Sequence, residues 1–155
     1  MRRPGGWYDV ARRHPRHRHP PRLSPTSPSL LPPAVVADDD PAMRRVLARL
    51  TARAGFAVVE AHDGQAALRA AETQLADGRP PALLVADVQM PGLAGVALAA
   101  CAAALVPGMR VLLTSGAPLP ADAACALAGV HYTFLPKPFA ITAFDAALAT
   151  LGARG

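Results

Sequence analysis

The segment Ala82-Leu83-Leu84-Val85-Ala86-Asp87 is an uninterrupted apolar run that ends at a carboxylate. Short apolar runs without alternating polar side chains are typical of strands that are covered on both faces of a parallel sheet. Four other short, largely apolar segments are found at residues 34–37, 56–60, 111–114 and 131–135. The sequence therefore predicts five strands, most of them buried by elements on either side.

Segments with a helical spacing of apolar residues separate these strands. Asp40 and Pro41 open the first one as an N-cap acid and a proline in the first turn, and Gly55 ends it. Arg44 and Arg45 are assigned to its solvated face. Four more helices are expected at residues 64–76, 95–105, 120–128 and 139–151. This alternation predicts an α/β fold with a doubly wound five-stranded parallel sheet.

The first 33 residues differ in composition from the rest of the chain. They contain seven arginines against a single acid, Asp9, and eight of the 17 prolines. Such a stretch buries too little apolar surface to offset chain entropy. We expect a disordered Arg/Pro/His-rich tail at residues 1–33, a folded domain at 34–152 and a short C-terminal tail at 153–155. A solvated tail, a start codon assigned too far upstream, and an arm that binds nucleic acid or acidic lipid all stay open for residues 1–33.

Charge, hydropathy and cysteine content exclude several classes of protein. The net charge of the chain is +5, but residues 34–155 carry −1, so no nucleic-acid binding by the folded domain is expected. Residues 88–109 carry no charge, yet prolines and glycines interrupt them, which argues against a membrane span and for a cytoplasmic location. Cys101 and Cys125 lie in Ala-rich helical segments and are predicted to be buried small hydrophobes in a reducing compartment.

Polar side chains follow four of the predicted strands. They are Asp38 and Asp39 after the first strand, Asp87 at the end of the third, Ser115 at the end of the fourth and Lys137 after the fifth. The carboxyl ends of parallel strands meet at one edge of a sheet, so these side chains are expected to gather there. Crowded carboxylates repel one another unless a cation neutralises them, and hard oxygen ligands favour Mg²⁺. A carboxylate nucleophile, a cation, a lysine and a hydroxyl are the groups that phosphoryl transfer to an aspartate requires.

Four segments resemble the receiver domain of bacterial two-component response regulators. They are Val35-Val36-Ala37-Asp38-Asp39-Asp40-Pro41, Asp87-Val88-Gln89-Met90-Pro91-Gly92, Leu113-Thr114-Ser115-Gly116 and Phe134-Leu135-Pro136-Lys137-Pro138-Phe139. They are similar to the acidic loop, the phospho-acceptor segment, the switch strand and the invariant-lysine segment of that family. The resemblance covers roughly residues 34–152 and implies a flavodoxin-like (βα)5 domain with strand order 2-1-3-4-5.

The resemblance also implies an acceptor and a cofactor. Asp87 would be phosphorylated by a histidine kinase or a histidine phosphotransfer protein. Mg²⁺ would be the cofactor, with Asp39, Asp87 and the backbone carbonyl of Gln89 as direct ligands and Asp38 as a ligand through water.

The remaining motif positions imply a switch. Lys137 and Ser115 would bind the phosphoryl group, and Ser115 with the aromatic Phe134 would form the switch pair. The family pattern allows either Thr114 or Ser115 as the switch hydroxyl, and we choose Ser115 because a small residue follows it. The Lys137-Pro138 bond is expected to be cis, as it commonly is in this family.

These inferences describe a single-domain response regulator, a phosphoryl acceptor rather than a turnover enzyme. Its output would pass to an unknown protein partner through residues 119–151, and homodimerisation on that face is left open. Two alternatives are a haloacid-dehalogenase-type phosphatase, which would need Asp38 as nucleophile with Asp40 two residues on, and a phosphorylation-independent interaction module. Nucleic-acid binding through the arginine tail is a third.

Overall fold

The computed structural model describes residues 31–155, so the predicted tail lies almost entirely outside the described residues. The strands are β1 (Pro33–Ala37), β2 (Ala57–Ala61), β3 (Leu83–Asp87), β4 (Arg110–Ser115) and β5 (His131–Pro136). The helices are α1 (Pro41–Arg53), α2 (Gly64–Ala76), α3 (Gly95–Leu105), α4 (Ala123–Ala126) and α5 (Ile141–Thr150). All neighbouring strands are parallel and their order is β2-β1-β3-β4-β5, which confirms the predicted fold and strand order.

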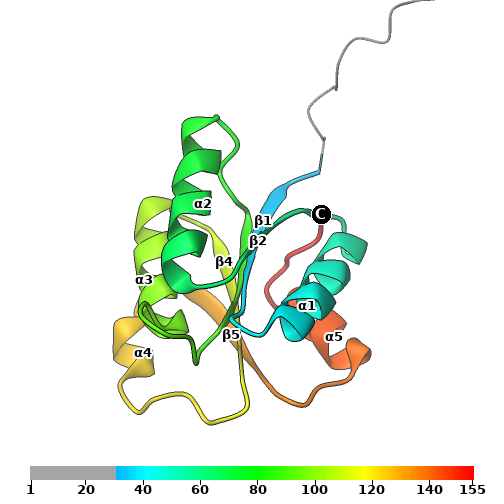
Figure 1. The fold of residues 1–155 in the computed structure, drawn as a ribbon, viewed down its shortest axis with the longest axis vertical. Coiled ribbons are helices and arrows are strands. Elements are labelled where there is room, and N and C mark those ends of the chain that lie inside the picture. The colour runs from blue at the N-terminus through cyan, green and yellow to red at the C-terminus, as the bar shows by residue number, and fades with distance from the viewer. Residues whose placement is uncertain (1–30) are drawn as a thin grey trace, which may run out of the picture.

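Helices cover both faces of the sheet, with α1 and α5 on one side and α2, α3 and α4 on the other (Figure 1). Every residue of β1 and β3 is buried. Side chains that alternate along the strands feed two separate cores. Val36, Val85 and Leu112 pack towards α1 and α5, and Val35, Leu84 and Leu113 pack towards α2 and α3. The apolar runs lack alternation because both faces of the central strands are buried.

Side chains just before two helices fix where these helices begin. The Asp40 carboxylate accepts a hydrogen bond from the Ala42 amide at 2.9 Å, and the Asp63 carboxylate accepts one from the Ala66 amide at 2.6 Å. Each of these bonds satisfies a backbone donor that the first turn leaves without a helical partner. The prediction that Asp40 is a helix cap is confirmed.

Several element boundaries differ from the prediction. The fourth helix was expected at residues 120–128, but only Ala123–Ala126 is α-helical, and Asp122 provides no side-chain cap. A helix without a cap and with few buried side chains lacks the interactions that would stabilise additional turns. The fifth helix begins at Ile141 instead of residue 139, because Ala140 is extended (ψ 156°). The shifts at strand ends are one residue each.

The cysteine prediction was wrong, since both Cys101 and Cys125 are exposed free thiols. The buried face of α3 is formed by Leu98, Ala99 and Ala102, and Cys101 falls on the other side of the helix. In an Ala-rich helix with no charged residue, the sequence does not mark which side faces water.

Both ends of the described chain are more ordered than the predicted boundaries imply. Pro33 was assigned to the tail, but it is the first residue of β1 and is buried. Ala153 was assigned to the C-terminal tail, but it is 1% exposed and packs in the core under α1 and α5. The Gly155 amide donates to the Ala54 carbonyl at 3.2 Å, so the last residues close over the end of α1.

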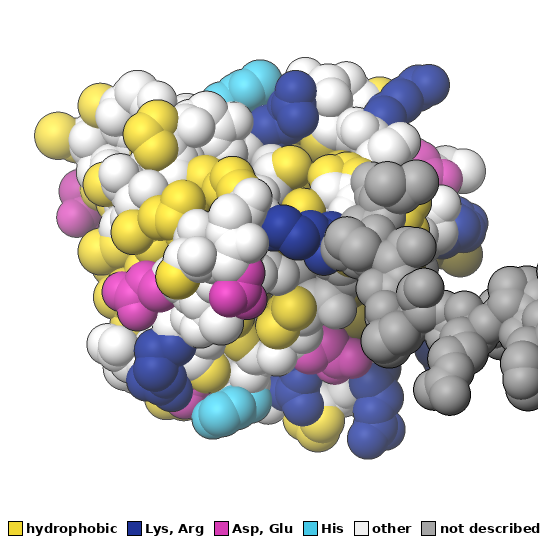
Figure 2. Space-filling model, turned by 90° about the horizontal axis from the view of Figure 1, so that it is seen from above, with side chains coloured by type: hydrophobic (Ala, Val, Ile, Leu, Met, Phe, Trp, Pro, Cys, Tyr) yellow, Lys and Arg dark blue, Asp and Glu magenta, His cyan; other side chains and the backbone are white. Residues whose placement is uncertain are grey.

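Two further observations concern the length of the helices and the charge of the surface. Among residues 31–155, no helix is both long and apolar enough to cross a membrane. The face at the amino end of β1 shows basic, acidic and apolar side chains intermingled over the described residues, without a continuous basic patch (Figure 2).

Candidate functional site

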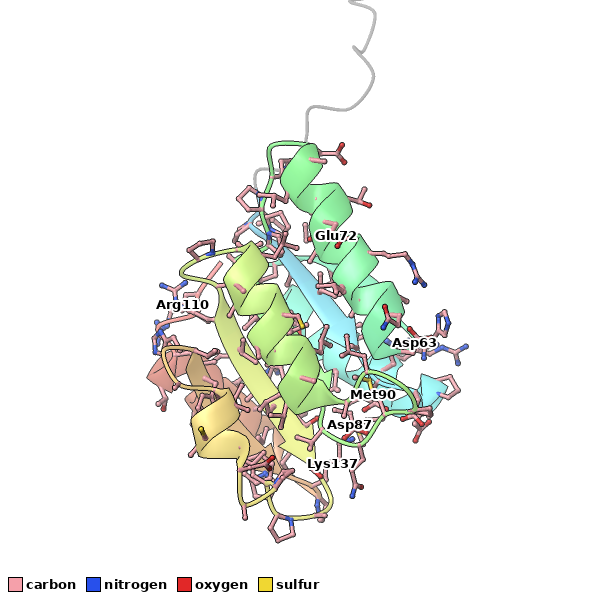
Figure 3. The ribbon with its side chains drawn as sticks, turned by 90° about the vertical axis from the view of Figure 1, so that its left-hand side faces the viewer. Asp63, Glu72, Asp87, Met90, Arg110 and Lys137 are labelled. Atoms are coloured by element: carbon pink, nitrogen blue, oxygen red, sulfur yellow. The ribbon has the colours of Figure 1, made fainter. Side chains whose placement is uncertain are left out.

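The carboxyl ends of the strands bring the predicted site residues to one edge of the sheet. Asp87 is the last residue of β3, and Lys137 follows directly after β5. Figure 3 shows Asp87 and Lys137 near each other at the carboxyl ends of the strands. Asp38 and Asp39 follow β1, which lies next to β3 in the sheet. The site is therefore assembled from chain segments that only the parallel sheet brings together.

Three carboxylates form the centre of this edge. Asp38, Asp39 and Asp87 each offer one carboxylate oxygen, and these three oxygens lie within 4.8 Å of one another. Asp38 is completely buried and Asp87 is 8% exposed, whereas Asp39 is exposed to solvent. Clustered carboxylate oxygens that are open to water on one side fit a hard divalent cation such as Mg²⁺, which keeps several of its own waters.

Lys137 contacts two of these carboxylates. Its Nζ lies 3.0 Å from Oδ2 of Asp38 and 3.3 Å from Oδ2 of Asp87, and its side chain is 17% exposed. The lysine therefore provides the positive charge that the two buried acids require.

Burial raises the pKa of Asp38 above its usual range, although the Asp40 amide and Lys137 both act in the opposite direction. The Asp40 amide donates to Oδ1 of Asp38 at 2.9 Å, while Lys137 donates to Oδ2. Both carboxylate oxygens of Asp38 are thus engaged inside the protein.

The segment after Asp87 folds back onto its carboxylate. The Gln89 amide donates to Oδ1 of Asp87 at 3.1 Å. The Val88 amide donates to the Thr114 carbonyl at 2.8 Å, and the Val88 carbonyl accepts from the Gly95 amide at 3.1 Å. Gln89 is held beside the carboxylate of Asp87, while the acceptor role of Asp87 and the ligand role of the Gln89 carbonyl oxygen stay predictions.

The two candidate switch hydroxyls have different surroundings. Ser115 is 1% exposed, and its Oγ accepts a hydrogen bond from the Ala117 amide at 3.1 Å. Thr114 is fully buried, and its Oγ1 has no hydrogen-bond partner. Leu113 packs on the α3 side of the sheet and Leu112 on the α5 side, so Ser115 falls on the α3 side and Thr114 on the α5 side.

The end of β5 is tied to the end of β4. The Lys137 amide donates to the Ser115 carbonyl at 2.8 Å. The Lys137-Pro138 peptide bond is cis, as predicted. Phe134 pairs in register with Leu113 and lies partly buried against the core beneath α3. The lysine, the candidate switch serine and the aromatic residue therefore belong to one connected pair of strands.

One functional contact was missed in the sequence. Arg44 was assigned to a solvated helix face together with Arg45, but its Nη1 donates to the Asp38 carbonyl at 2.8 Å. Its Nε lies 3.4 Å from Oε2 of Glu60 on β2. The arginine links α1, the acidic loop and the edge strand. Its place in the second turn of a helix that starts directly after the acidic loop is the signal in the sequence.

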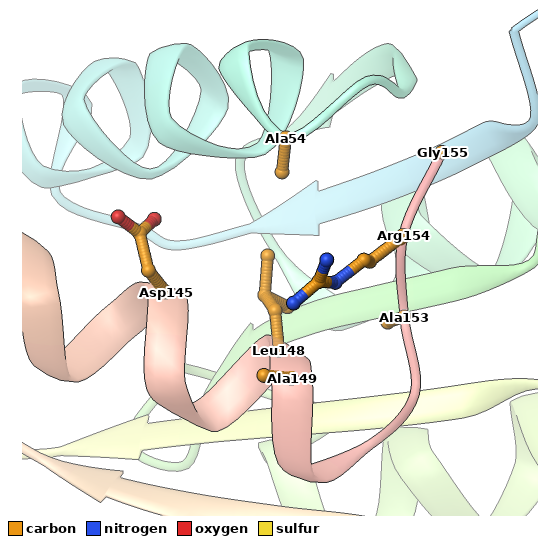
Figure 4. A pocket seen from close by; sticks show the side chains of 7 residues that line it. All are labelled: Ala54, Asp145, Leu148, Ala149, Ala153, Arg154 and Gly155. Carbon is orange, nitrogen blue, oxygen red and sulfur yellow. The ribbon is translucent and has the colours of Figure 1, made fainter.

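A hollow of about 300 Å³ lies away from this edge, between α1, α5 and the C-terminal residues (Figure 4). It is lined by Ala54, Asp145, Leu148, Ala149, Ala153, Arg154 and Gly155. The acid in its wall, Asp145, is paired with Arg53 at 2.7 Å. The carboxylate cluster contributes nothing to this hollow, so the candidate chemistry belongs to the sheet edge.

The sequence profile of the response regulator receiver domain matches residues 34–149. This match spans the sheet, the carboxylate cluster and the lysine. The chain belongs to the response regulator receiver family. A curated relative is the response regulator MprA of Mycobacterium avium, 33% identical over 107 residues, a match that covers 69% of this chain and 45% of the relative. The same protein of Mycobacterium tuberculosis is also 33% identical, with 44% of its length covered. The chain thus spans a little under half the length of these relatives.

Solved structures agree with this assignment. The signal receiver domain of NarL from Mycobacterium tuberculosis is 32% identical, with a TM-score of 0.64, and the match covers 82% of this chain and 100% of that one. The chemotaxis protein CheY4 of Vibrio cholerae has a TM-score of 0.66 at 21% identity, covering 78% of this chain and 98% of that one, and shows the shared fold. Sequence family and fold therefore both identify residues 34–149 as a receiver domain.

Proposed function

We propose that this receiver domain accepts a phosphoryl group on Asp87 from a histidine kinase or a histidine phosphotransfer protein. One observation carries the proposal: Asp87 ends a buried strand 3.3 Å from Lys137, within a cluster of three carboxylates. Burial of a carboxylate beside like charges is costly unless a partner or a cation compensates it. That Asp87 is 8% exposed leaves it accessible to a donor that docks at the sheet edge.

The transfer moves the phosphoryl group from a nitrogen to an oxygen. A carboxylate oxygen of Asp87 attacks the phosphorus in line, and the bond to the imidazole nitrogen of the donor breaks. The nitrogen keeps the electron pair of that bond, and the product on this chain is an acyl phosphate. The Lys137 ammonium offsets the charge on the phosphoryl oxygens, and the Ser115 hydroxyl turns to donate to one of them.

The donor set fits Mg²⁺. Asp39, Asp87 and the Gln89 carbonyl would hold it directly, and Asp38 through water, because Asp38 already uses both oxygens within the protein. When bound, Mg²⁺ supplies positive charge that reduces repulsion between the carboxylates and the incoming phosphoryl group.

The output follows from movement of Ser115 and Phe134. Ser115 would exchange its bond with the Ala117 amide for one with the phosphoryl group, which would move its side chain on the α3 side of the sheet. Phe134 packs against that side, and it would turn inward when Ser115 moves. The surface formed by residues 119–151 then changes its affinity for a protein partner in the cytoplasm. We propose that the receiver domain acts through such a partner.

The test is intact mass after incubation with acetyl phosphate and Mg²⁺. The wild-type protein should gain one phosphoryl group, and Asp87→Asn should gain none. Asp77→Asn is the matched control, because Asp77 is an exposed acid at the end of α2 and should leave the adduct unchanged. An adduct that forms on Asp87→Asn, or without Mg²⁺ at the same rate, would contradict the proposal.

The phosphatase alternative is tested in the same preparation. It requires Asp38 as nucleophile, but this carboxylate is fully buried, and Asp40 caps α1. Steady hydrolysis of a phosphomonoester that is lost in Asp38→Asn and kept in Asp87→Asn would favour the phosphatase. A partner that binds the phosphorylated wild type, the unphosphorylated wild type and Asp87→Asn with equal affinity would instead favour a phosphorylation-independent interaction module.

A further inference from the structure

The loop of residues 88–94 contains Gln89, which lies beside the carboxylate of Asp87. The loop contacts the first residues of α2 and α3. It ends where α3 begins, and α2 packs along α3 on the same face of the sheet (Figure 3). At each end of the loop a glycine allows another backbone segment to approach. These glycines are Gly64, the first residue of α2, and Gly95, the first residue of α3.

Neither glycine has room for a side chain. A Cβ atom at Gly64 would overlap the carbonyl oxygen of Leu93 and approach the Leu93 Cβ. A Cβ atom at Gly95 would overlap the Asp87 carbonyl group and the Val88 Cα. The neighbours that would be struck are mostly backbone atoms, which have no flexible side-chain end to move aside. The start of the loop therefore packs closely against the first residue of α3, and the end of the loop packs closely against the first residue of α2.

Backbone conformation does not explain Gly64. The glycines with positive φ among the described residues are Gly55, Gly78, Gly92, Gly108, Gly129 and Gly152. Gly64, the first residue of α2, is not one of them, so its backbone conformation does not require glycine. The contact with Leu93, and not the backbone conformation, therefore excludes a side chain at Gly64.

We propose that Gly64 is a positioning residue for the cation and phosphoryl site. It acts through the loop: close approach of α2 fixes Leu93, and the fixed loop holds Gln89 beside Asp87, where the Gln89 amide donates to Oδ1. The inference rests on the proposed phosphorylation of Asp87 with Mg²⁺. It adds a residue of α2 to a site that is otherwise formed by segments following β1, β3, β4 and β5.

The test compares Gly64→Ala with Gln65→Ala, which changes an exposed neighbour in the same helical turn. Mg²⁺ affinity is measured by calorimetry, the rate of adduct formation by intact mass with acetyl phosphate, and the unfolding midpoint in EDTA by circular dichroism. Gly64→Ala should bind Mg²⁺ about 10- to 100-fold more weakly, the usual effect of disturbing groups that orient metal ligands. Gln65→Ala should match the wild type in all three measurements.

The unfolding midpoint separates positioning from general stability. A folded Gly64→Ala protein in EDTA with weakened Mg²⁺ binding and a slower adduct supports the inference, whereas wild-type affinity and rate overturn it. If Gly64→Ala does not fold, Leu93→Gly decides, because it frees the same loop without adding an atom. Weaker Mg²⁺ binding by Leu93→Gly supports the inference, and unchanged binding overturns it. A wild-type protein that neither binds Mg²⁺ nor forms an adduct would refute the proposed function itself.

Discussion

The ammonium nitrogen of Lys137 lies 3.3 Å from Oδ2 of Asp87, so the proposed acceptor carboxylate is already paired with a cationic group in the unphosphorylated protein. The same nitrogen lies 3.0 Å from Asp38. A single lysine therefore holds together two acids from neighbouring strands, and it occupies the place where phosphoryl oxygens would carry negative charge. The resting contact and the proposed reaction depend on the same side chain.

Lys137→Met should lower the free energy of unfolding by about 2 kcal/mol in EDTA at pH 7, because it leaves the buried Asp38 carboxylate without its cationic partner. Mg²⁺ should restore most of this loss by neutralising the cluster. Urea unfolding with EDTA or Mg²⁺ measures both effects, with Arg49→Met on the exposed side of α1 as control. A variant that is as stable as the wild type in EDTA would show that the lysine contact contributes nothing to the fold.

Thr114→Val should change the stability of the fold, whereas Ser115→Ala should change the rate of phosphorylation. Thr114 buries a hydroxyl without a partner, so valine of the same shape should stabilise the fold by about 1 kcal/mol and leave the phosphorylation rate unchanged. Ser115→Ala removes the proposed phosphoryl contact and should slow adduct formation severalfold. Urea unfolding and the acetyl phosphate time course distinguish the two residues. The reverse pattern of rates would assign the switch hydroxyl to Thr114.

The raised pKa of Asp38 predicts how its contribution to stability changes with pH. Because the folded protein binds this proton more tightly than an ordinary aspartate with a pKa of 3.8, the contribution is fully present below pH 3.8 and is lost as the pH rises through the folded value. In EDTA, the free energy of unfolding of the wild type relative to Asp38→Asn should therefore fall from acid to neutral pH.

Asp63 provides a control of opposite sign for that experiment. The hydrogen bond from the Ala66 amide holds the pKa of Asp63 below 3.8, so its contribution is present above pH 3.8 and is lost as the pH falls through the folded value. The difference between the wild type and Asp63→Asn should shrink on acidification. If both differences change in the same direction with pH, one of the two assignments is wrong.

Arg44→Met should weaken Mg²⁺ binding severalfold, because it releases the Asp38 carbonyl and with it the turn that carries Asp39. Arg45→Met is the matched control, since Arg45 is the exposed next residue of the same helix. Both variants remove one positive charge, so a charge effect alone would change the two affinities equally. Calorimetric titration with Mg²⁺ makes the comparison.

Much of the fold could be predicted because each central strand is apolar along its whole length and each first helical turn has a local signal. The run Leu83–Ala86 and the cap at Asp40 depend on neighbours in the sequence, and both are as predicted. Cys101, the ends of α4 and the contact of Arg44 were not predicted. Cys101 lies on an uncharged Ala-rich helix, which does not mark its buried side. The ends of α4 reflect a missing cap and few buried side chains, and the Arg44 contacts depend on where the fold places the Asp38 carbonyl and Glu60.

By itself, the sequence determined the order of strands and helices and which polar residues follow the strand ends. The signals for these features are the spacing of apolar residues, the helix caps and the turn residues, and each of them involves only a few neighbouring positions. Only the tertiary structure decided that Lys137 reaches both Asp38 and Asp87, that Thr114 and Ser115 fall on different faces, and that Gly64 lies against Leu93. These are distances between segments far apart in the chain. They are set by how closely helices pack onto a twisted sheet, which no local pattern of residues specifies.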